Sequence, residues 1–516
     1  MYSEGTIAGQ YSKCESQRSA YLERGRESSK LTVPTILPEA GNKSSQRFPT
    51  PYQSIGARGV NNLASALLLS LLPPNAPFFR LVLDEGEKKK MDVVDPRIKS
   101  EVESSLAEIE RAVSREIEVN NIRVATFEAL RHLVVTGNAL LYMPDKGPMR
   151  VIHLDRYVVK RDPMGTARMI ILKETVSPDT LPKEYREYAQ SKMGGHEETC
   201  DIFTMQVIKD DGKVEITQEI YGKIVEETRA TYSKDRSPFI ALRMLRVDGE
   251  AYGRGYVEQY LGDLISLEGL TKAIVEGAAA SSKVLFLVNP NGTTRARTLA
   301  ESPNGAIREG SAADVSVLQT QKSADFSVAL SAMQQISDRL SYAFLLTEST
   351  IRNADRVTAE EVRLVTQSIE RQLGGIYSVL SQEFQLPLVN RLMERMTKEK
   401  RLPKIPKDKI TPAIVTGIDA LGRGNDLNRL DIYLQGIAQV LGPENLNMYL
   451  DMREYMTRRA SALGIDTSGL IRSEEEVAGI MQQQQQAEAM RVATQSLGPN
   501  AVKMMAQQQQ AEAVSE

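Results

Sequence analysis

The fold is decided by residues 255–292, GYVEQYLGDLISLEGLTKAIVEGAAASSKVLFLVNPNG. Apolar residues recur there at steps of three or four, which predicts an amphipathic helix with one buried side from about Gly255 to Ser282. They are Tyr256, Tyr260, Leu264, Leu267, Leu270 and Ile274. Such a helix is roughly 40 Å long, more than one small core needs. Its last turns, from Gly277, carry only small side chains, which allow a neighbouring helix to approach closely.

A second helix returns along the first. The predicted strand Lys283–Val288 ends at the turn signal Asn289–Gly292. Farther on, a helical spacing begins again, with Phe326, Leu330, Met333, Ile336, Leu340 and Phe344. The sequence therefore predicts two antiparallel helices joined by a compact, strand-rich insert.

A third helix is signalled by Thr358-Ala359-Glu360-Glu361, a capping box in which the first and last side chains satisfy backbone N–H groups reciprocally. Its apolar face comprises Val362, Val365, Ile369, Leu373, Ile376, Leu380 and Phe384. Gly374-Gly375 should soften this helix and Pro387 should kink it. The polar segment Thr347–Val357 before it carries Arg352, Asn353 and Arg356 and is expected to be the part most free to move.

The remaining segments predict an α+β fold that is mainly α. Helices are expected at Tyr11–Arg26, Gly56–Leu72, Pro96–Val119 and Arg123–Thr136. Strands are expected between Asn138 and about Phe239, at Ala139–Met143, Val151–Val159, Arg168–Lys173, and in a hairpin of Ile202–Ile208 with Lys213–Ile220. After Asp419 the pattern is helical, and the glutamine tracts 482–486 and 507–510 cannot build a core.

Composition limits the class of protein. A chain of 516 residues with 41% hydrophobic content can fill several regions. Its longest apolar run, Leu63–Leu72, is closed by Pro73-Pro74 and is too short to span a membrane. The N-terminus lacks the apolar core of a signal peptide, which predicts cytoplasmic synthesis. The two cysteines, Cys14 and Cys200, lie far apart and argue against a disulfide framework or a cysteine metal cluster.

The sequence contains only weak matches to catalytic or ligand-binding motifs. We therefore predict no catalytic residues, no cofactor and no metal. No GxxxxGK[ST] phosphate loop occurs, and Gly253-Arg254-Gly255 has Glu258 where a dinucleotide motif needs glycine. The three histidines, His132, His153 and His196, form no HExxH pair. The acidic clusters at Glu360-Glu361 and 474–476 are explained by helix starts, where negative charge is favoured.

Three arginines in the insert, Arg295, Arg297 and Arg308, are the other candidate contacts. They could meet DNA or the acidic surface of a partner, or they could be solvated loop residues.

Five segments carry a resemblance to a known family. They are PYQSIGARGVNNLASALLLSLLP (51–73), LVVTGNALLYMP (133–144), VDGEAYGRGYVEQYLGDLISLEGLTKAIVE (247–276), RVTAEEVRLV (356–365) and LGGIYSVLSQEFQLPLV (373–389). In these segments, spread over roughly residues 10–470, the chain resembles the portal (head-to-tail connector) proteins of short-tailed, autographivirus-type podophages.

The resemblance implies a dodecameric ring around a channel for double-stranded DNA, bound without sequence specificity. Residues 1–250 would form the N-terminal part of a wing, 251–282 and 325–346 the two stem helices, 283–324 a clip and 347–357 a tunnel loop. Residues 358–418 would form the tunnel helix and the rest of the wing, 419–480 a crown, and 481–516 a mobile tail. By this reading Arg352, Asn353 and Arg356 face the channel.

The resemblance also implies partners and a location. The ring would sit at the capsid portal vertex of the virion, after assembly in the host cytoplasm. It would bind the large terminase subunit, scaffolding and major capsid proteins, and tail adaptor and internal core proteins, and no membrane.

Net charge leaves the alternatives open. A formal charge of −3 suits a conduit through which DNA slides, because proteins that hold DNA tightly usually carry a basic excess. An acidic protein that never meets DNA fits the charge equally well. A nucleic-acid-processing enzyme, with carboxylates brought together from separate segments, and another virion scaffold or adaptor protein remain the alternative functions.

Overall fold

The computed structural model describes residues 5–39, 41, 47–74, 78–84, 96–193, 198–281, 285–318, 323–346, 373–403, 410–414 and 432–439, with isolated positions from 442 to 487. The chain divides into two compact units, Met1–Ala420 and Leu421–Glu516. Described residues of the second unit include a helical segment, 432–439. All elements named below belong to the first unit, which mixes helices and strands as predicted.

Four helices of the N-terminal part confirm the predicted pattern. They are α1 (Ile7–Lys30), α2 (Ile55–Leu71), α4 (Pro96–Val119) and α5 (Ile122–Thr136). Helix α1 begins four residues earlier than predicted because tertiary contacts support its first turn. The backbone N–H groups of Ile7 and Ala8 donate to the buried carboxylate of Glu219, at 2.6 and 3.2 Å. A negative charge at a helix N-terminus is stabilising.

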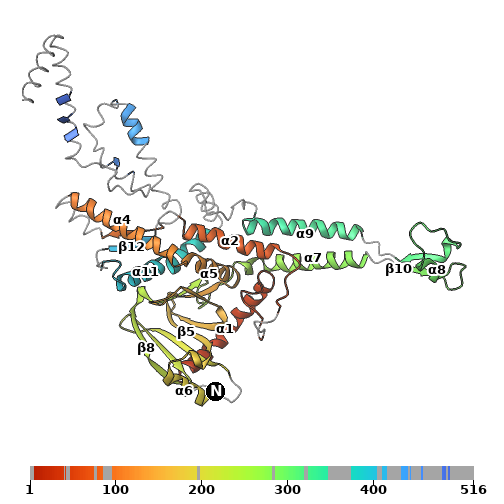
Figure 1. Cartoon of the computed structure of the whole chain (residues 1–516), viewed down its shortest axis with the longest axis horizontal. Coiled ribbons are helices and arrows are strands. Elements are labelled where there is room, and N and C mark those ends of the chain that lie inside the picture. The colour runs from red at the N-terminus through yellow and green to blue at the C-terminus, as the bar shows by residue number, and fades with distance from the viewer. Residues whose placement is uncertain are drawn as a thin grey trace, which may run out of the picture. The chain divides into compact units, whose positions relative to one another are not determined.

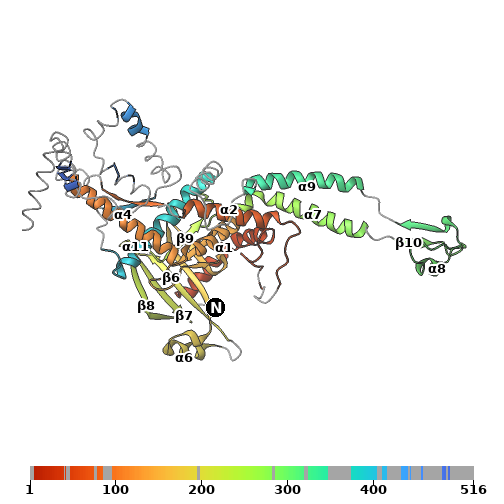
Figure 2. The ribbon, with the colours of Figure 1, turned by 45° about the horizontal axis from the view of Figure 1, so that its top comes forward.

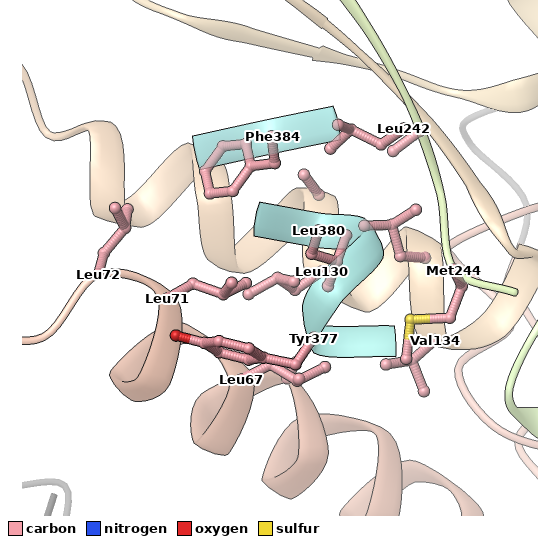
Figure 3. Packing of buried hydrophobic residues seen from close by; sticks show 14 of the residues in the cluster. Leu67, Leu71, Leu72, Leu130, Val134, Leu242, Met244, Tyr377, Leu380 and Phe384 are labelled. Carbon is pink, nitrogen blue, oxygen red and sulfur yellow. The ribbon is translucent and has the colours of Figure 1, made fainter. Parts of the chain in front are cut away.

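The main core lies between helices α2 and α5 and the helical segment 373–380. Figure 3 shows Leu67 and Leu71 of α2 next to Leu130 of α5, with Tyr377 packed among them. The tyrosine hydroxyl donates to the carbonyl of Ser70 at 3.0 Å, so its polar end is satisfied inside the core.

Two antiparallel sheets follow. The first has the order β3-β2-β9 and the second the order β4-β5-β6-β7-β8. The strands are β2 (Asn138–Tyr142), β3 (Arg150–Ile152), β9 (Phe239–Arg243), β4 (Tyr157–Arg161), β5 (Ala167–Val176), β6 (Cys200–Ile208), β7 (Lys213–Ile220) and β8 (Lys223–Ser233). Helix α1 packs on the five-stranded sheet through Ile7, Tyr11 and Cys14 (Figure 1). The predicted hairpin of β6 and β7 is confirmed.

Other strand predictions need correction. The segment Val151–Val159 is not one strand, because the 3-10 turn η1 (Leu154–Arg156) separates β3 from β4 and sends them to different sheets. Helix α6 (Lys183–Lys192) was not predicted; it is short and buries only Tyr185 and Ala189. Strands β8 and β9 were not predicted either.

Two glycine-containing segments of the sequence meet in a tight seam. Gly137 ends α5 with a φ of +76°, and a Cβ added there would lie 2.3 Å from the carbonyl carbon of Arg254. The side chain of Asn138 donates to the Gly253 carbonyl and accepts from the Gly253 N–H, both at 2.8 Å. The seam joins TGN (136–138) to GRG (253–255), which belong to two of the segments that carry the family resemblance.

The third predicted helix is described from Leu373 onward, and its capping box at residues 358–361 lies outside the described residues. Leu373, Ile376, Leu380 and Phe384 are buried, which confirms this part of the apolar face. A π-helical turn, η7 (Ser381–Gln385), lies directly before Pro387, and α11 (Leu386–Lys398) continues from it.

The π-helical turn places Glu383 against the first sheet. Its carboxylate accepts from the backbone N–H of Arg243 at 3.2 Å and from the guanidinium of that residue. The arginine side chain is 2% exposed. Finally, β1 (Phe79–Leu83) pairs with β12 (Ile410–Ile414), from Phe79 opposite Ile414 to Leu83 opposite Ile410.

Candidate functional site: the helical hairpin and its insert

The two predicted long helices exist and form a hairpin. Helix α7 (Leu261–Ser281) follows a 3-10 turn, η4 (Val257–Tyr260), so the regular helix begins six residues after the predicted start at Gly255. Helix α9 (Ser323–Ala343) returns along it. Figures 1 and 2 show α7 and α9 side by side in both views. We call this pair the hairpin.

The base of the hairpin is fixed by an aromatic cluster. The rings of Tyr256, Tyr260 and Phe344 lie 5.3 to 5.8 Å apart, and the Tyr256 hydroxyl donates to the Ala343 carbonyl at 2.9 Å. Burial raises the pKa of Tyr256 far above its usual value, so this hydroxyl stays protonated. Gly59 of α2 lies under Phe344, where an added Cβ would come within 2.6 Å of the ring.

Burial decreases along the hairpin away from this base. Leu264, Leu267 and Leu340 are buried. Farther along, most predicted face residues are only half-buried: Leu270, Ile274, Phe326, Met333 and Ile336. Leu330 was predicted on the same face, but it is 47% exposed and lies on an uncovered side instead. A pair of helices has only one shared face, and the remaining sides of each helix meet solvent in a single chain.

Apolar side chains lie on those remaining sides. They are Ile265, Val275, Val328, Leu330 and Tyr342, between 47% and 70% exposed. We call these five residues the hairpin stripe. Single exposed apolar residues need no explanation, but five on one pair of helices indicate surfaces for packing, on more than one side because Val328 and Leu330 are only two positions apart. The stripe was not predicted, because the sequence pattern shows the buried face and not what the hairpin leaves uncovered.

The insert between the helices is a small strand pair with an ordered turn. Strands β10 (Leu285–Val288) and β11 (Val315–Leu318) are antiparallel, and α8 (Ala296–Ala300) lies between them in sequence. The carboxylate of Asp314 accepts from the Thr294 N–H at 3.0 Å and the Thr293 hydroxyl at 3.1 Å. The Thr294 hydrogen bond in particular lowers the pKa of Asp314, so this carboxylate keeps its negative charge to a lower pH than a free aspartate does.

The structure brings the three candidate arginines onto this insert, and all three are exposed. Arg297 pairs with Glu301 at 2.9 Å, and Arg308 donates to the Ser302 hydroxyl at 3.1 Å. Arg295 precedes α8 at its N-cap position. Glu301 offsets part of the positive charge. The other candidates, Arg352, Asn353 and Arg356, lie outside the described residues.

Among the helices that the structure describes, none is long and apolar enough to cross a bilayer. The described features, a hairpin fixed at its base, an uncovered apolar stripe and a small charged insert, are typical of a structural subunit that assembles with other chains.

Comparison with known proteins identifies the family of this chain. Residues 4–471 match the family described as "Bacteriophage head to tail connecting protein", and the chain belongs to this family. It is 39% identical over 482 residues to the portal protein of Escherichia phage T7, covering 92% of this chain and 89% of that protein. The portal protein of Enterobacteria phage T3 matches at 39% over 481 residues, with coverage of 92% and 89%. That of Enterobacteria phage SP6 matches at 30% over 487 residues, with coverage of 93% and 92%.

These matches confirm the resemblance drawn from the five segments. Similarity also extends to solved chains from the neck of an empty gene transfer agent particle, at 11% identity and a TM-score of 0.34, covering 80% of this chain and 90% of that chain. A chain in the virion of the native gene transfer agent particle has 10% identity and a TM-score of 0.33, with coverage of 80% and 90%. The family assignment rests on the sequence matches.

Proposed function

We propose that this chain is the subunit of a portal ring of twelve copies at one capsid vertex, which forms the channel for packaging and ejecting double-stranded DNA. The observation that carries the proposal is the hairpin stripe on α7 and α9. The names of the relatives, portal proteins of three phages, support it.

The hairpin stripe can hold a ring of copies together. Burying an exposed Val, Ile or Leu side chain is worth about 1.5–3 kcal/mol, so five half-exposed apolar side chains offer several kcal/mol to a neighbouring hairpin. A contact between different sides of the same helix pair is heterologous, and it gives a closed ring when the rotation from one copy to the next divides a full turn. Each copy then covers the stripe of the next.

Ring formation depends on the stripe in a way that one substitution tests. Val328→Glu places a charge on the stripe at a position that is 70% exposed in the single chain. We expect the wild type to give a species of about 690 kDa for twelve chains of 57.2 kDa, and the variant to give mainly single chains. Native mass spectrometry at micromolar concentration measures both.

Met164→Glu is the matched control, because Met164 is 81% exposed and lies between β4 and β5, far from the hairpin in sequence. It should assemble as the wild type does. A wild type that remains monomeric over a range of salt concentrations, or a Val328→Glu variant that assembles fully, contradicts the proposal.

In the proposed ring, the residues 283–324 form a clip on which the terminase large subunit and later the tail adaptor dock, with Arg295, Arg297 and Arg308 as contacts for DNA or an acidic partner surface. Residues 419–480 form the crown, near the internal core proteins. Scaffolding and major capsid proteins hold the ring at its vertex. With a charge of −3 per chain, the ring holds DNA weakly enough for sliding.

Arg352 and Arg356 supply the proposed positive ring inside this channel. Phosphate contacts of this kind are screened by salt and carry no sequence information. We expect Arg352→Ala with Arg356→Ala to leave assembly unchanged and to alter DNA packaging or retention, with no ATPase activity in the ring itself. Asp355 and Glu360 lie close to Arg356 in sequence and could compete with DNA for it, so we expect Arg352 to have the larger effect. A packaging assay on assembled particles measures the result.

A control of equal charge is Arg150→Ala with Arg168→Ala, two exposed arginines on β3 and β5. The control should package normally. If the variant with both loop arginines replaced packages and retains full-length genomes at the normal rate, the loop has no role in packaging.

A further inference from the structure

Two of the three histidines of the chain lie in contact, although 21 positions separate them in sequence. His132 is on α5 and His153 directly precedes η1, and their rings meet edge to face with centroids 4.6 Å apart. Glu128 lies one helical turn before His132, at the i, i+4 spacing that places both on one side of α5. One ligand atom from each of the three residues lies within 4.8 Å of the other two.

The hydrogen bonding of His153 leaves one ring nitrogen ready to bind a cation. Its Nδ1 lies 3.1 Å from the carbonyl oxygen of Ile36. A carbonyl only accepts, so Nδ1 carries the proton and Nε2 keeps a lone pair. Histidines that bind metals are usually held by this kind of backbone contact.

His132 lies inside the core, where it is 3% exposed. Packing alone explains a buried histidine. The added observation here is that a second imidazole and a carboxylate converge on it.

We propose that Glu128, His132 and His153 bind one first-row divalent cation of the Zn²⁺ type, with water completing the coordination. Two imidazoles and one carboxylate are a typical ligand set for zinc, whereas Ca²⁺ and Mg²⁺ require mainly oxygen ligands. Bonds of about 2.0–2.1 Å bring tetrahedral ligand atoms to about 3.4 Å from one another. Glu128 is exposed and free to rotate, so it can close the remaining gap.

The ion would strengthen the connection between segments that already touch, since α5 packs on β3 and the ring of His132 contacts that of His153. It links α5 to the turn between β3 and β4, and through His153 to the loop that follows α1 at Ile36. A ligand that binds only the folded state stabilises it according to its concentration and dissociation constant. The positive charge of Arg131 opposes the cation, which makes this site weaker than one without a neighbouring arginine.

The experiment uses the full chain after treatment with EDTA and removal of the chelator. Titration with ZnCl₂ by calorimetry gives stoichiometry and affinity, and titration with CoCl₂ gives a visible absorption band if the ion has nitrogen and oxygen ligands in a tetrahedral site. We expect one ion per chain and a higher melting temperature with zinc than with EDTA. Glu128→Gln and His153→Gln should each weaken binding at least tenfold, since loss of even an outer partner costs about 10–100-fold.

His196→Gln is the matched control, because it removes the remaining histidine of the chain. It should bind zinc as the wild type does. The test replaces Glu128 and His153 and not His132, because His132 is buried and its replacement would also change the core. Absence of binding, or equal affinity in the wild type, Glu128→Gln and His153→Gln, overturns the proposal; circular dichroism of each variant confirms that it is folded.

Discussion

Replacing Gly137 with alanine is expected to lower the free energy of unfolding by about 3–4 kcal/mol, the sum of a left-handed backbone cost and a steric one. Gly137 has a φ of +76°, a backbone angle that residues with a side chain rarely adopt. The added Cβ would also lie 2.3 Å from a backbone carbon of Arg254, which cannot move aside as a flexible side chain can. Urea unfolding followed by far-ultraviolet circular dichroism measures the loss.

Gly212→Ala separates the two causes. Gly212 has nearly the same φ, +77°, but an added Cβ would meet nothing within 4 Å. This variant should lose only the backbone part, about 1–2 kcal/mol. Equal losses at Gly137 and Gly212 would show that the close approach between TGN and GRG contributes nothing, contrary to our account of the seam.

Replacing Glu383 with alanine is expected to destabilise the protein by about 3 kcal/mol, near the lower end of the range for breaking a buried ion pair. The Arg243 side chain is 2% exposed and Glu383 19% exposed. Glu383 also stabilises the charged form of a second guanidinium, that of Arg161. Burial lowers the pKa of Arg161 to about 10, and the negative charge of Glu383 raises this pKa and so offsets part of the decrease. Without Glu383, the buried charge of Arg243 and the half-buried charge of Arg161 lose their counter-charge. Thermal unfolding of the variant measures the effect.

Two further variants make this test specific. Glu383→Leu combined with Arg243→Met should recover part of the loss, because an apolar pair replaces a broken ionic one. Asp263→Ala breaks the hairpin pair Asp263–Arg339, whose side chains are 31% and 61% exposed, and should cost less than about 1 kcal/mol. If Glu383→Ala lowers the stability no more than Asp263→Ala does, burial does not make the Arg243–Glu383 pair more important than an exposed pair.

Local patterns of the sequence predicted much of this fold. The hairpin helices, α2, α4, α5 and the β6–β7 hairpin all have their pattern within one short segment, so periodicity and turn residues identified them. The family resemblance was carried by segments that the structure joins, as at Gly137 and Gly255. Domain boundaries and the roles of Arg295, Arg297, Arg308, Arg352, Asn353 and Arg356 remain predictions.

Features that depend on distant residues were not predicted. Nothing near Phe79 shows that β1 pairs with β12, and the split of Val151–Val159 follows from the two sheets and not from local propensity. His132 and His153 share no motif in the sequence, yet the fold places their rings in contact. Hydrophobic spacing identifies a buried face, but it does not show which residues from elsewhere will share a site.

The pairing of β1 with β12 has a consequence for how the chain is made. Phe79 and its partner Ile414 are separated by 335 positions, so at about 5–20 residues per second roughly 17–67 s pass between their synthesis on the ribosome. During that interval β1 is an open strand edge, and the hairpin with its apolar stripe, which ends at Ala343, is synthesised before β12. The speed of translation therefore sets how long each nascent subunit presents surfaces that can join the wrong chain.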